Sequence, residues 1–234
     1  MKNKFIVIEG TDCSGKETQS KLLVKKLNEL QMKSIYFTFP VYESPTGKVV
    51  SWYLNKTEHL PEGLGPLFKE GADKVDPWVA SCYYAADRRD NMDKITDALN
   101  QGYNVILDRY VYSNMAHQGG KLTDKNNRKQ IFDKLEAFEF DILELPKPDE
   151  TIFLHMPYEQ ACILKGNRTN LDDHEKNVEH LKRAEQTYLE LSERYNFKYV
   201  SCVENNEIRS IENINEELLE NIKTIIKTDS NIRK

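Results

Sequence analysis

The chain has 234 residues, of which 39% are hydrophobic and 30% charged, with a net charge of −5, so it is long enough for one soluble α/β domain with a substantial core. The acidic balance argues against a nucleic-acid partner, and because no apolar run reaches the roughly 18–20 residues of a spanning helix we expect no membrane partner either. Four widely spaced cysteines without a C-x-x-C pair, and a start that lacks a signal-peptide core, favour a cytoplasmic protein with free thiols.

The first elements are a strand, a loop and a helix. Residues 5–9 form a short β-rich apolar run that is typical of a buried strand. Leucines recur at helical spacing over residues 16–30, which predicts an amphipathic helix directly after a glycine-containing loop. A second strand is expected over 34–39, where Pro40 stops it.

The middle of the chain predicts a long loop followed by a long helix. Residues 55–77 are rich in glycine, proline and charge and are predicted to be a loop. Asp76 and Pro77 are a good helix start, as N-cap and first helical residue, and the helix should run to about Asn100. The apolar run at 104–108 then predicts a third strand.

The remaining third continues the alternation of helices and strands. In chain order we expect a helix at 124–140, a strand at 151–155, helices at 158–165 and 173–195, a strand at 197–202 and a helix at 211–227. Strands that alternate with helices indicate an α/β fold: a five-stranded parallel sheet covered by helices on both faces. Ligands of such folds bind beyond the carboxyl ends of the strands.

The loop after the first strand matches the phosphate-binding pattern G-x-x-x-x-G-K-[ST] at every fixed position except the last, which is Glu17. Its main-chain N–H groups and the following helix start would hold phosphates, and Lys16 would add a positive charge. The predicted ATP-binding residues are Gly10, Cys13, Ser14, Gly15, Lys16, Glu17 and Thr18. The alternative is a strand–helix turn that binds no ligand.

Glu17 stands where the pattern has a hydroxyl that ligates Mg²⁺. Three interpretations remain open. Glu17 points to solvent while water and substrate phosphates hold the metal, its carboxylate coordinates the metal directly or through water, or Thr18 partly substitutes for the hydroxyl. The first is favoured, because Mg²⁺ gives up its waters reluctantly.

Three further groups of residues indicate chemistry. Asp108 ends an apolar strand and is expected to hold Mg²⁺ through water, with Arg109 beside it, although a strand-end salt bridge is the alternative. On the long helix predicted before this strand, Tyr84 and Arg88 share a face and could stack on a base and grip an anion, or form an ordinary surface pair. A polar segment containing Arg168 could close as a lid or be a solvated loop.

Taken together, these motifs resemble the thymidylate kinases, which phosphorylate dTMP. The resemblance spans nearly the whole chain and rests on FIVIEGTDCSGKETQ, FPVY at 39–42, YYAADR at 83–88, DRYVYSNMAHQ at 108–118 and KPDETIFLHMP at 147–157. It implies one domain over 1–234 of the P-loop NTPase and nucleoside monophosphate kinase type, with a lid at about 165–177 and a long acceptor-side loop at about 55–77. It also implies ATP and dTMP as substrates, Mg²⁺ as cofactor and a homodimer.

The resemblance assigns roles to single residues. The catalytic residues that it implies are Lys16, Asp108, Arg109 and Arg168. The acceptor would be bound by Asp12, at the deoxyribose 3′-hydroxyl; Phe39 and Tyr42, near its phosphate; Tyr84, stacked on thymine; Arg88, at a thymine carbonyl or the phosphate; Arg109, at the phosphate; Ser113 and Asn114, at the base edge; and His117, where tyrosine is common.

Three departures leave alternatives open. Glu17 replaces the loop hydroxyl, His155 stands where many members have aspartate, and the loop at 55–77 is longer than usual beside the acceptor entrance. A kinase of another deoxynucleotide or of a deoxynucleoside would share the same motifs. A non-catalytic nucleotide-binding module is the remaining alternative.

Overall fold

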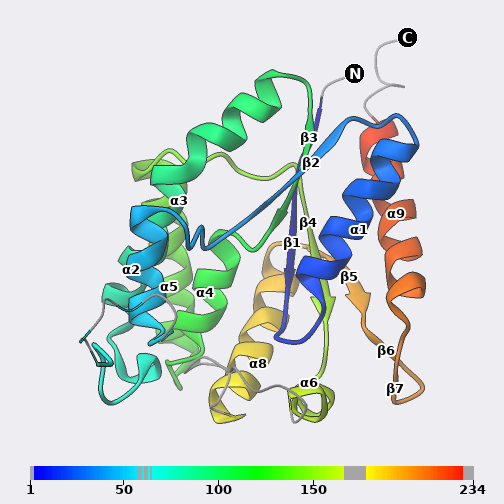
Figure 1. The fold of residues 1–234 in the computed structure, drawn as a ribbon. Coiled ribbons are helices and arrows are strands. Elements are labelled where there is room, and N and C mark those ends of the chain that lie inside the picture. The colour runs from blue at the N-terminus through cyan, green and yellow to red at the C-terminus, as the bar shows by residue number, and fades with distance from the viewer. Residues whose placement is uncertain (1–2, 57–59, 61–62, 64, 166–177, 229–234) are drawn as a thin grey trace.

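The computed structural model describes residues 3–56, 60, 63, 65–165 and 178–228. Its centre is a five-stranded parallel sheet with strand order β2-β3-β1-β4-β5 (Figure 1). The strands are β1 (Phe5–Gly10), β2 (Ser34–Thr38), β3 (Asn104–Asp108), β4 (Glu150–His155) and β5 (Lys198–Ser201). The five predicted strands and their parallel arrangement are therefore confirmed.

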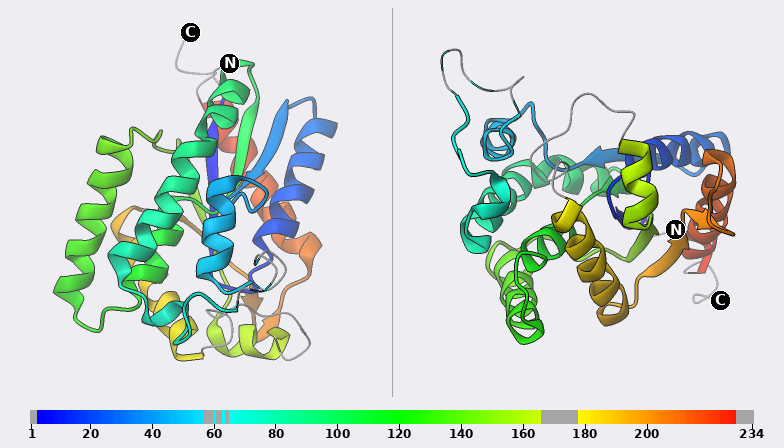
Figure 2. Two further views of the ribbon diagram at one scale, coloured as in Figure 1. Left: turned by 60° about the vertical axis from the view of Figure 1, so that its left-hand side comes forward. Right: turned by 90° about the horizontal axis from the view of Figure 1, so that it is seen from below.

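Helices cover both faces of this sheet. They are α1 (Lys16–Glu29), α2 (Pro45–Tyr53), α3 (Pro77–Asn100), α4 (Val111–Gly119), α5 (Lys125–Glu136), α6 (Tyr158–Lys165), α8 (Val178–Arg194) and α9 (Ile211–Thr228). Helices α1 and α9 pack together on one face, and α3, α4 and α8 cover the other (Figures 1 and 2). The central strand β1 is buried along its whole length, as expected for a strand covered on both sides.

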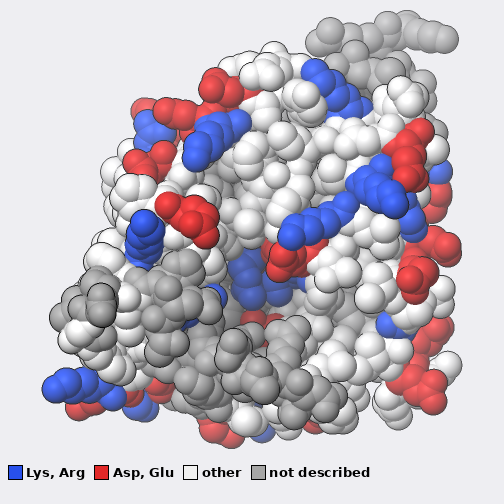
Figure 3. Space-filling model, in the orientation of Figure 1, with Lys and Arg blue, Asp and Glu red and all other residues white. Residues whose placement is uncertain are grey.

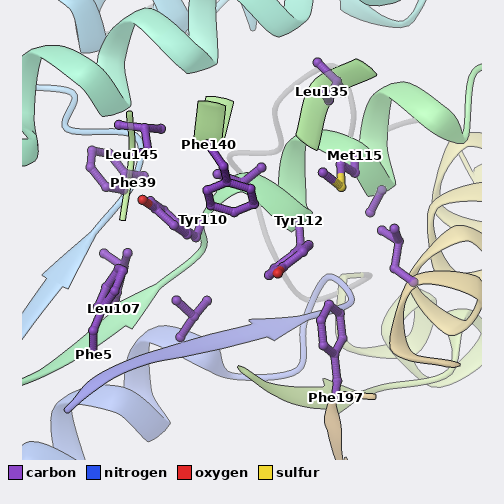
Figure 4. Close-up of a cluster of buried hydrophobic side chains, with 14 of the residues drawn as sticks. Phe5, Phe39, Leu107, Tyr110, Tyr112, Met115, Leu135, Phe140, Leu145 and Phe197 are labelled. Carbon is purple, nitrogen blue, oxygen red and sulfur yellow. The ribbon is translucent and has the colours of Figure 1, made fainter. Parts of the chain in front are cut away.

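Side chains from segments far apart in the sequence meet in an aromatic core on the α3–α4 side. Tyr110 lies against Phe5, Phe39 and Phe140, with ring centroids 5.4–6.3 Å apart (Figure 4). The Tyr110 hydroxyl donates to the Pro146 carbonyl, which satisfies its only polar group in this apolar setting. This packing fixes the segment directly after β3.

The strand register brings the functional segments to one edge of the sheet. Asp108 at the end of β3 is level with Ile8 of β1 and with Thr38 of β2. The carboxyl ends of the parallel strands therefore meet at the lower edge in Figure 1, where β1 continues into the loop before α1.

Two helices were missed by the sequence analysis. Helix α2 has an ordinary start, because Ser44 accepts a hydrogen bond from the Gly47 amide and Pro45 is the first helical residue. Helix α4 has no side-chain cap of its own. Its cap comes from β1, since a carboxylate oxygen of Glu9 accepts the amides of Tyr110 and Ser113, at 2.9 and 3.0 Å.

Other boundaries differ from the prediction in smaller ways. The helix expected over 124–140 ends at Glu136 and continues as a π-helical turn, Ala137–Ile142. Within the loop expected at 55–77, the described part includes a 3-10 turn, Ala72–Lys74. A short antiparallel hairpin, Val203–Glu204 with Glu207–Ile208, follows β5. The first residues of the helix expected at 173–195 lie outside the described residues, and its visible part is α8.

Candidate active site

The loop between β1 and α1 is curved by two residues in the left-handed region. Cys13 has φ 59° and Gly15 has φ 75°, and Gly15 is the N-cap of α1. Such a backbone turns successive N–H groups toward one point, which suits an anion. Gly10 is required for space, because a Cβ there would lie 2.6 Å from the Leu154 carbonyl oxygen. Local geometry thus agrees with the predicted phosphate-binding loop.

Lys16 is buried inside this loop. Its ammonium donates to the carbonyls of Gly10 and Thr11, at 2.9 and 2.8 Å, and lies 3.4 Å from the Ser14 hydroxyl. Burial, with a smaller contribution from Arg109, lowers the pKa of Lys16 to about 8. Incoming phosphates would oppose that shift, since nearby anions favour the charged lysine.

A proton-uptake prediction follows from this lowered pKa. At about pH 8.5 a group with a pKa near 8 is largely deprotonated, whereas a phosphate-bound lysine stays charged. We therefore expect ATP binding at that pH to take up a proton, measured as calorimetric heats that differ between buffers of different ionisation enthalpy. Lys16→Met should abolish the difference. Buffer-independent heats for the native protein would contradict the prediction.

We expect the stability of the folded protein to depend on pH in a corresponding way. Because the pKa of Lys16 is lower in the folded protein than its ordinary value of 10.5, the unfolded chain binds more protons between about pH 8 and 10.5. The burial of this lysine therefore costs stability below pH 8, and that cost disappears as pH rises through this window.

Asp108 lies at the end of β3, beside the strand that leads into the loop. It is 5% exposed, its Oδ2 lies 3.5 Å from the Tyr36 hydroxyl, and its Oδ1 is buried without a hydrogen-bond partner among the described residues. Burial raises the pKa of Asp108, while Lys16 and Arg109 lower it. An unpartnered buried carboxylate oxygen suits a hydrated Mg²⁺, whose waters would donate to it.

A cavity opens beside Arg109, on the α3–α4 side of the loop. It encloses about 660 Å³, including its open mouth, and all nine residues predicted to bind the acceptor line it. They are Asp12, Phe39, Tyr42, Tyr84, Arg88, Arg109, Ser113, Asn114 and His117. Figure 3 shows basic and acidic side chains together in a hollow in the lower half of the molecule.

Arg109 lies at the end of this cavity that is nearest the phosphate-binding loop. Its backbone has φ 65°, and its guanidinium donates to Asp12 at 3.1 Å and lies 3.4 Å from the His117 ring. His117 in turn lies 3.2 Å from a nitrogen of His180, with the two rings stacked. The guanidinium is therefore held between the loop and α4, where the loop meets the cavity.

Two residues of the cavity wall, Arg88 and Asn114, are held by Glu139, which the sequence did not point to. Glu139 is fully buried in the π-helical turn and accepts hydrogen bonds from Arg88, at 2.7 Å for its NH2, and from the Asn114 amide at 2.9 Å. The Asn114 Oδ1 is buried and has no partner among the described residues. It is therefore an acceptor available to a ligand N–H.

Arg88 and Ser113, two further predicted acceptor residues, also have protein partners. Arg88 is 2% exposed, and its paired hydrogen bonds to Glu139 fix the plane of its guanidinium on the cavity wall. The Ser113 hydroxyl donates to Glu9 at 2.6 Å and lies 2.8 Å from the Tyr188 hydroxyl. Contacts of either side chain with a base or phosphate stay predictions.

The aromatic wall of the cavity is held from behind. Tyr84 packs edge-on against Tyr53 at 5.8 Å. The Tyr53 hydroxyl lies 3.1 Å from the ammonium of Lys121, which also donates to the carbonyls of Ala72 and Val75, both at 2.9 Å. Lys121 thus ties the end of the long loop to α4 and supports the ring that faces the cavity.

A second residue missed from the sequence, Asp87, positions the segment around Tyr42. It is 1% exposed and accepts the Val41 amide at 2.9 Å and the hydroxyls of Ser44 and Thr46, at 3.1 and 3.2 Å. Its place one residue before Arg88 in the motif YYAADR was the available signal. Its partners, more than 40 residues away, could not be inferred locally.

Comparison with known proteins gives a consistent result. A family model described as thymidylate kinase matches residues 8–215. The chain belongs to the thymidylate kinase family. A probable thymidylate kinase from Methanocaldococcus jannaschii is 32% identical over 223 residues, covering 95% of this chain and 97% of the relative. A thymidylate kinase from Plasmodium falciparum is 32% identical over 191 residues, covering 80% and 76%.

A solved structure agrees with this family assignment. The thymidylate kinase from Candida albicans superposes with a TM-score of 0.69 at 26% identity, covering 95% of this chain and 92% of that one. The predicted lid at 165–177, with Arg168, lies outside the described residues apart from its first position. No described helix is long and apolar enough to cross a membrane. Within the same residues, no three His, Cys, Asp or Glu side chains are grouped as metal ligands.

His155, another departure from the family pattern, has its own set of partners at the end of β4. Its ring nitrogens lie 2.7 Å from the Tyr199 hydroxyl and 2.6 Å from a carboxylate oxygen of Glu185. The other Glu185 oxygen accepts the Tyr158 amide at 2.9 Å and so holds the start of α6. In this member of the family a histidine links β4, β5, α6 and α8.

Proposed function

We propose that the protein is a dTMP kinase, which transfers the γ-phosphoryl group of ATP to dTMP and gives dTDP and ADP. Family membership supports the reaction, and the single observation that carries it to this chain is the cavity lined by all nine residues predicted to bind the acceptor. That cavity shares Arg109 and Asp12 with the edge of the phosphate-binding loop, so donor and acceptor phosphates would meet there.

The acceptor would lie with its base deep in the cavity and its phosphate toward the loop. Asn114 Oδ1, buried and unpartnered among the described residues, would accept the thymine N3–H, while Tyr84 would stack on the ring. The Asp12 carboxylate would accept a hydrogen bond from the deoxyribose 3′-hydroxyl. Arg109 would bind the phosphate, and Phe39 and Tyr42 would shape the wall beside it.

The transfer needs charge balance and alignment more than a protein base. The acceptor phosphate oxygen is already anionic at neutral pH and is the nucleophile, so no side chain must remove a proton. Lys16 and the loop amides would neutralise the donor phosphates, with Arg168 closing from the lid, and Arg109 would hold the two substrates in line. Mg²⁺, when bound beside Asp108, would neutralise charge on the β- and γ-phosphates.

The function is tested by an ADP-release assay with dTMP, dUMP, dGMP, dCMP and thymidine. We expect dTMP to give the highest kcat/KM. Preference for another nucleotide or for the nucleoside would select the related-kinase alternative. ATP binding without ADP release for any acceptor would select the non-catalytic one.

The stacking role of Tyr84 gives a specific prediction. Tyr84→Ala should raise the KM for dTMP roughly 5- to 150-fold, because stacking of a base on an aromatic ring is worth about 1–3 kcal/mol. Tyr84→Phe keeps the ring and is the matched control, with a KM close to that of the native protein. An unchanged KM in Tyr84→Ala would exclude the stacking role.

The proposed protein is a homodimer and is located in the cytoplasm. A homodimer is supported by family membership and by the start of α3, where Trp78 and Val79 are 39% and 43% exposed. None of the four cysteines forms a disulfide in the described structure, which supports a reducing compartment such as the cytoplasm. Sedimentation of the full chain would test the dimer.

A further inference from the structure

A hydrogen-bonded chain of two histidines runs from Arg109 to α8. Nη1 of Arg109 lies 3.4 Å from Nε2 of His117, and the other ring nitrogen of His117, Nδ1, lies 3.2 Å from Nε2 of His180. The two ring planes are nearly parallel, at 16°, with centroids 5.5 Å apart. His117 belongs to the end of α4 and His180 to the start of α8, so Arg109 is joined to a helix that carries none of the predicted site residues.

The proton pattern of arginine sets the direction of this chain. A guanidinium only donates hydrogen bonds, so His117 accepts the bond from Arg109 through an unprotonated Nε2. A neutral imidazole of that kind carries its proton on Nδ1, which therefore donates to an unprotonated Nε2 of His180. Every other arrangement of protons on the two rings sets two N–H groups against each other in one of the two contacts.

The position of the Arg109 guanidinium depends on this arrangement. Nη2 donates to Asp12 at 3.1 Å, so the guanidinium is bonded both by the loop and by α4. A proton on Nε2 of His117 would break the second bond, because two N–H groups would then meet. His180 opposes this, since its Nε2 gives the Nδ1 proton of His117 a partner, and its side chain is fully buried in the first turn of α8.

His117 stands where tyrosine is common in the family, and an imidazole needs a partner that a hydroxyl does not. A hydroxyl rotates its proton to suit a neighbouring donor, whereas a neutral imidazole carries its proton on one nitrogen or the other. Tyr188, another α8 side chain against the His117 ring, packs edge-on at 6.0 Å, and its hydroxyl lies 2.8 Å from that of Ser113. The α8 group that meets Nδ1 of His117 is His180.

We propose that His180 is a positioning residue for phosphoryl transfer: it accepts the Nδ1 proton of His117, holds the tautomer that binds Arg109, and so keeps the guanidinium where the acceptor phosphate would lie. The kinetic consequences rest on the proposed function, because they assume that Arg109 binds this phosphate. The proton pattern does not depend on the reaction and is measured on the native protein.

The proton pattern is tested by NMR of the full chain with ¹⁵N-labelled histidine at about pH 8, where an ordinary imidazole is neutral. The nitrogen shifts of a neutral ring show which nitrogen carries the proton, and we expect it on Nδ1 in both His117 and His180. His117→Tyr and His180→Gln assign the two sets of signals among the five histidines. A proton on Nε2 of either ring would overturn the proposal.

The positioning role is tested by kinetics. His180→Phe keeps a ring without an acceptor and should lower kcat about ten- to a hundredfold, the effect of a small misplacement of an aligning group, with the dissociation constant of ATP unchanged. His180→Gln places an acceptor oxygen near the position of Nε2 and should recover most of kcat. In the His117→Tyr background, His180→Phe should no longer lower kcat, because the imidazole that needs the partner is absent.

Two kinetic results would contradict the positioning role. Equal losses in His180→Phe and His180→Gln would assign the effect to packing, and the same loss in the His117→Tyr background would show that His180 does not act through His117. If His180→Phe does not fold, the NMR measurement still decides the proton pattern. Failure of dTMP phosphorylation by the native protein would leave that NMR result unaltered, so the failure of the proposed function is distinguishable from the failure of this proposal.

Discussion

Arg109→Ala should reduce kcat by roughly 10³–10⁵, the loss seen when a charge acting on a transferring phosphoryl group is removed. The expected cause is the position of the guanidinium, which lines the acceptor cavity while bonded to Asp12 of the phosphate-binding loop. ATP should still bind, because Lys16 and the loop amides are unchanged. Single-turnover kinetics and an ATP titration measure the two effects separately.

Two controls make the Arg109 experiment specific. Arg89→Ala removes an exposed arginine from α3 and should leave kcat near the native value. Arg109→Lys keeps the charge but not the planar fork, so it should restore only part of the activity. Lost ATP affinity with unchanged dTMP binding would contradict the assignment of Arg109 to the acceptor phosphate.

The second large effect is on stability. Glu139→Ala should lower the free energy of unfolding by about 3–5 kcal/mol, because it leaves Arg88, 2% exposed, as a buried charge without its partner. The Asn114 amide loses an acceptor in the same variant. Denaturant unfolding with an unchanged m-value would measure the loss.

The matched control is a substitution at Glu190, which is also a glutamate paired with an arginine. Glu190 pairs with Arg128 at 2.8 Å, but their side chains are 22% and 10% exposed, so solvent screens the pair. Glu190→Ala should therefore cost clearly less than Glu139→Ala. Equal losses, or a loss below about 1 kcal/mol in Glu139→Ala, would show that the buried pair is not a main contributor to stability.

Arg109 and Arg88 show how much of the site could be predicted from the sequence. Arg109 and Asp108 follow an apolar strand, and the loop of Lys16 follows another, so adjacency in a parallel sheet was predictable from local pattern. The helix carrying Tyr84 and Arg88 was also predictable, because Asp76 caps it with hydrogen bonds to the Trp78 and Val79 amides.

Most of what the sequence did not predict depends on contacts between distant segments; helix α2 is the exception, because its start signals at Ser44 and Pro45 are local. Glu9 caps α4 from more than 100 residues away, so α4 has no local start signal. Glu139 sits in a π-helical turn that carries it inward, a geometry that periodicity does not encode. Asp87 holds the segment at 41–46 from another helix. These three buried acids position the predicted residues rather than belong to a motif.

The most direct measurement is a crystal structure of the full chain with ADP and dTMP bound together. The account predicts thymine beside Tyr84 with N3–H toward Asn114, the acceptor phosphate on Arg109, and the ADP phosphates in the loop around Lys16, end to end with it. An acceptor bound outside the cavity, or with its phosphate at Glu139 and its base at the loop, would contradict it.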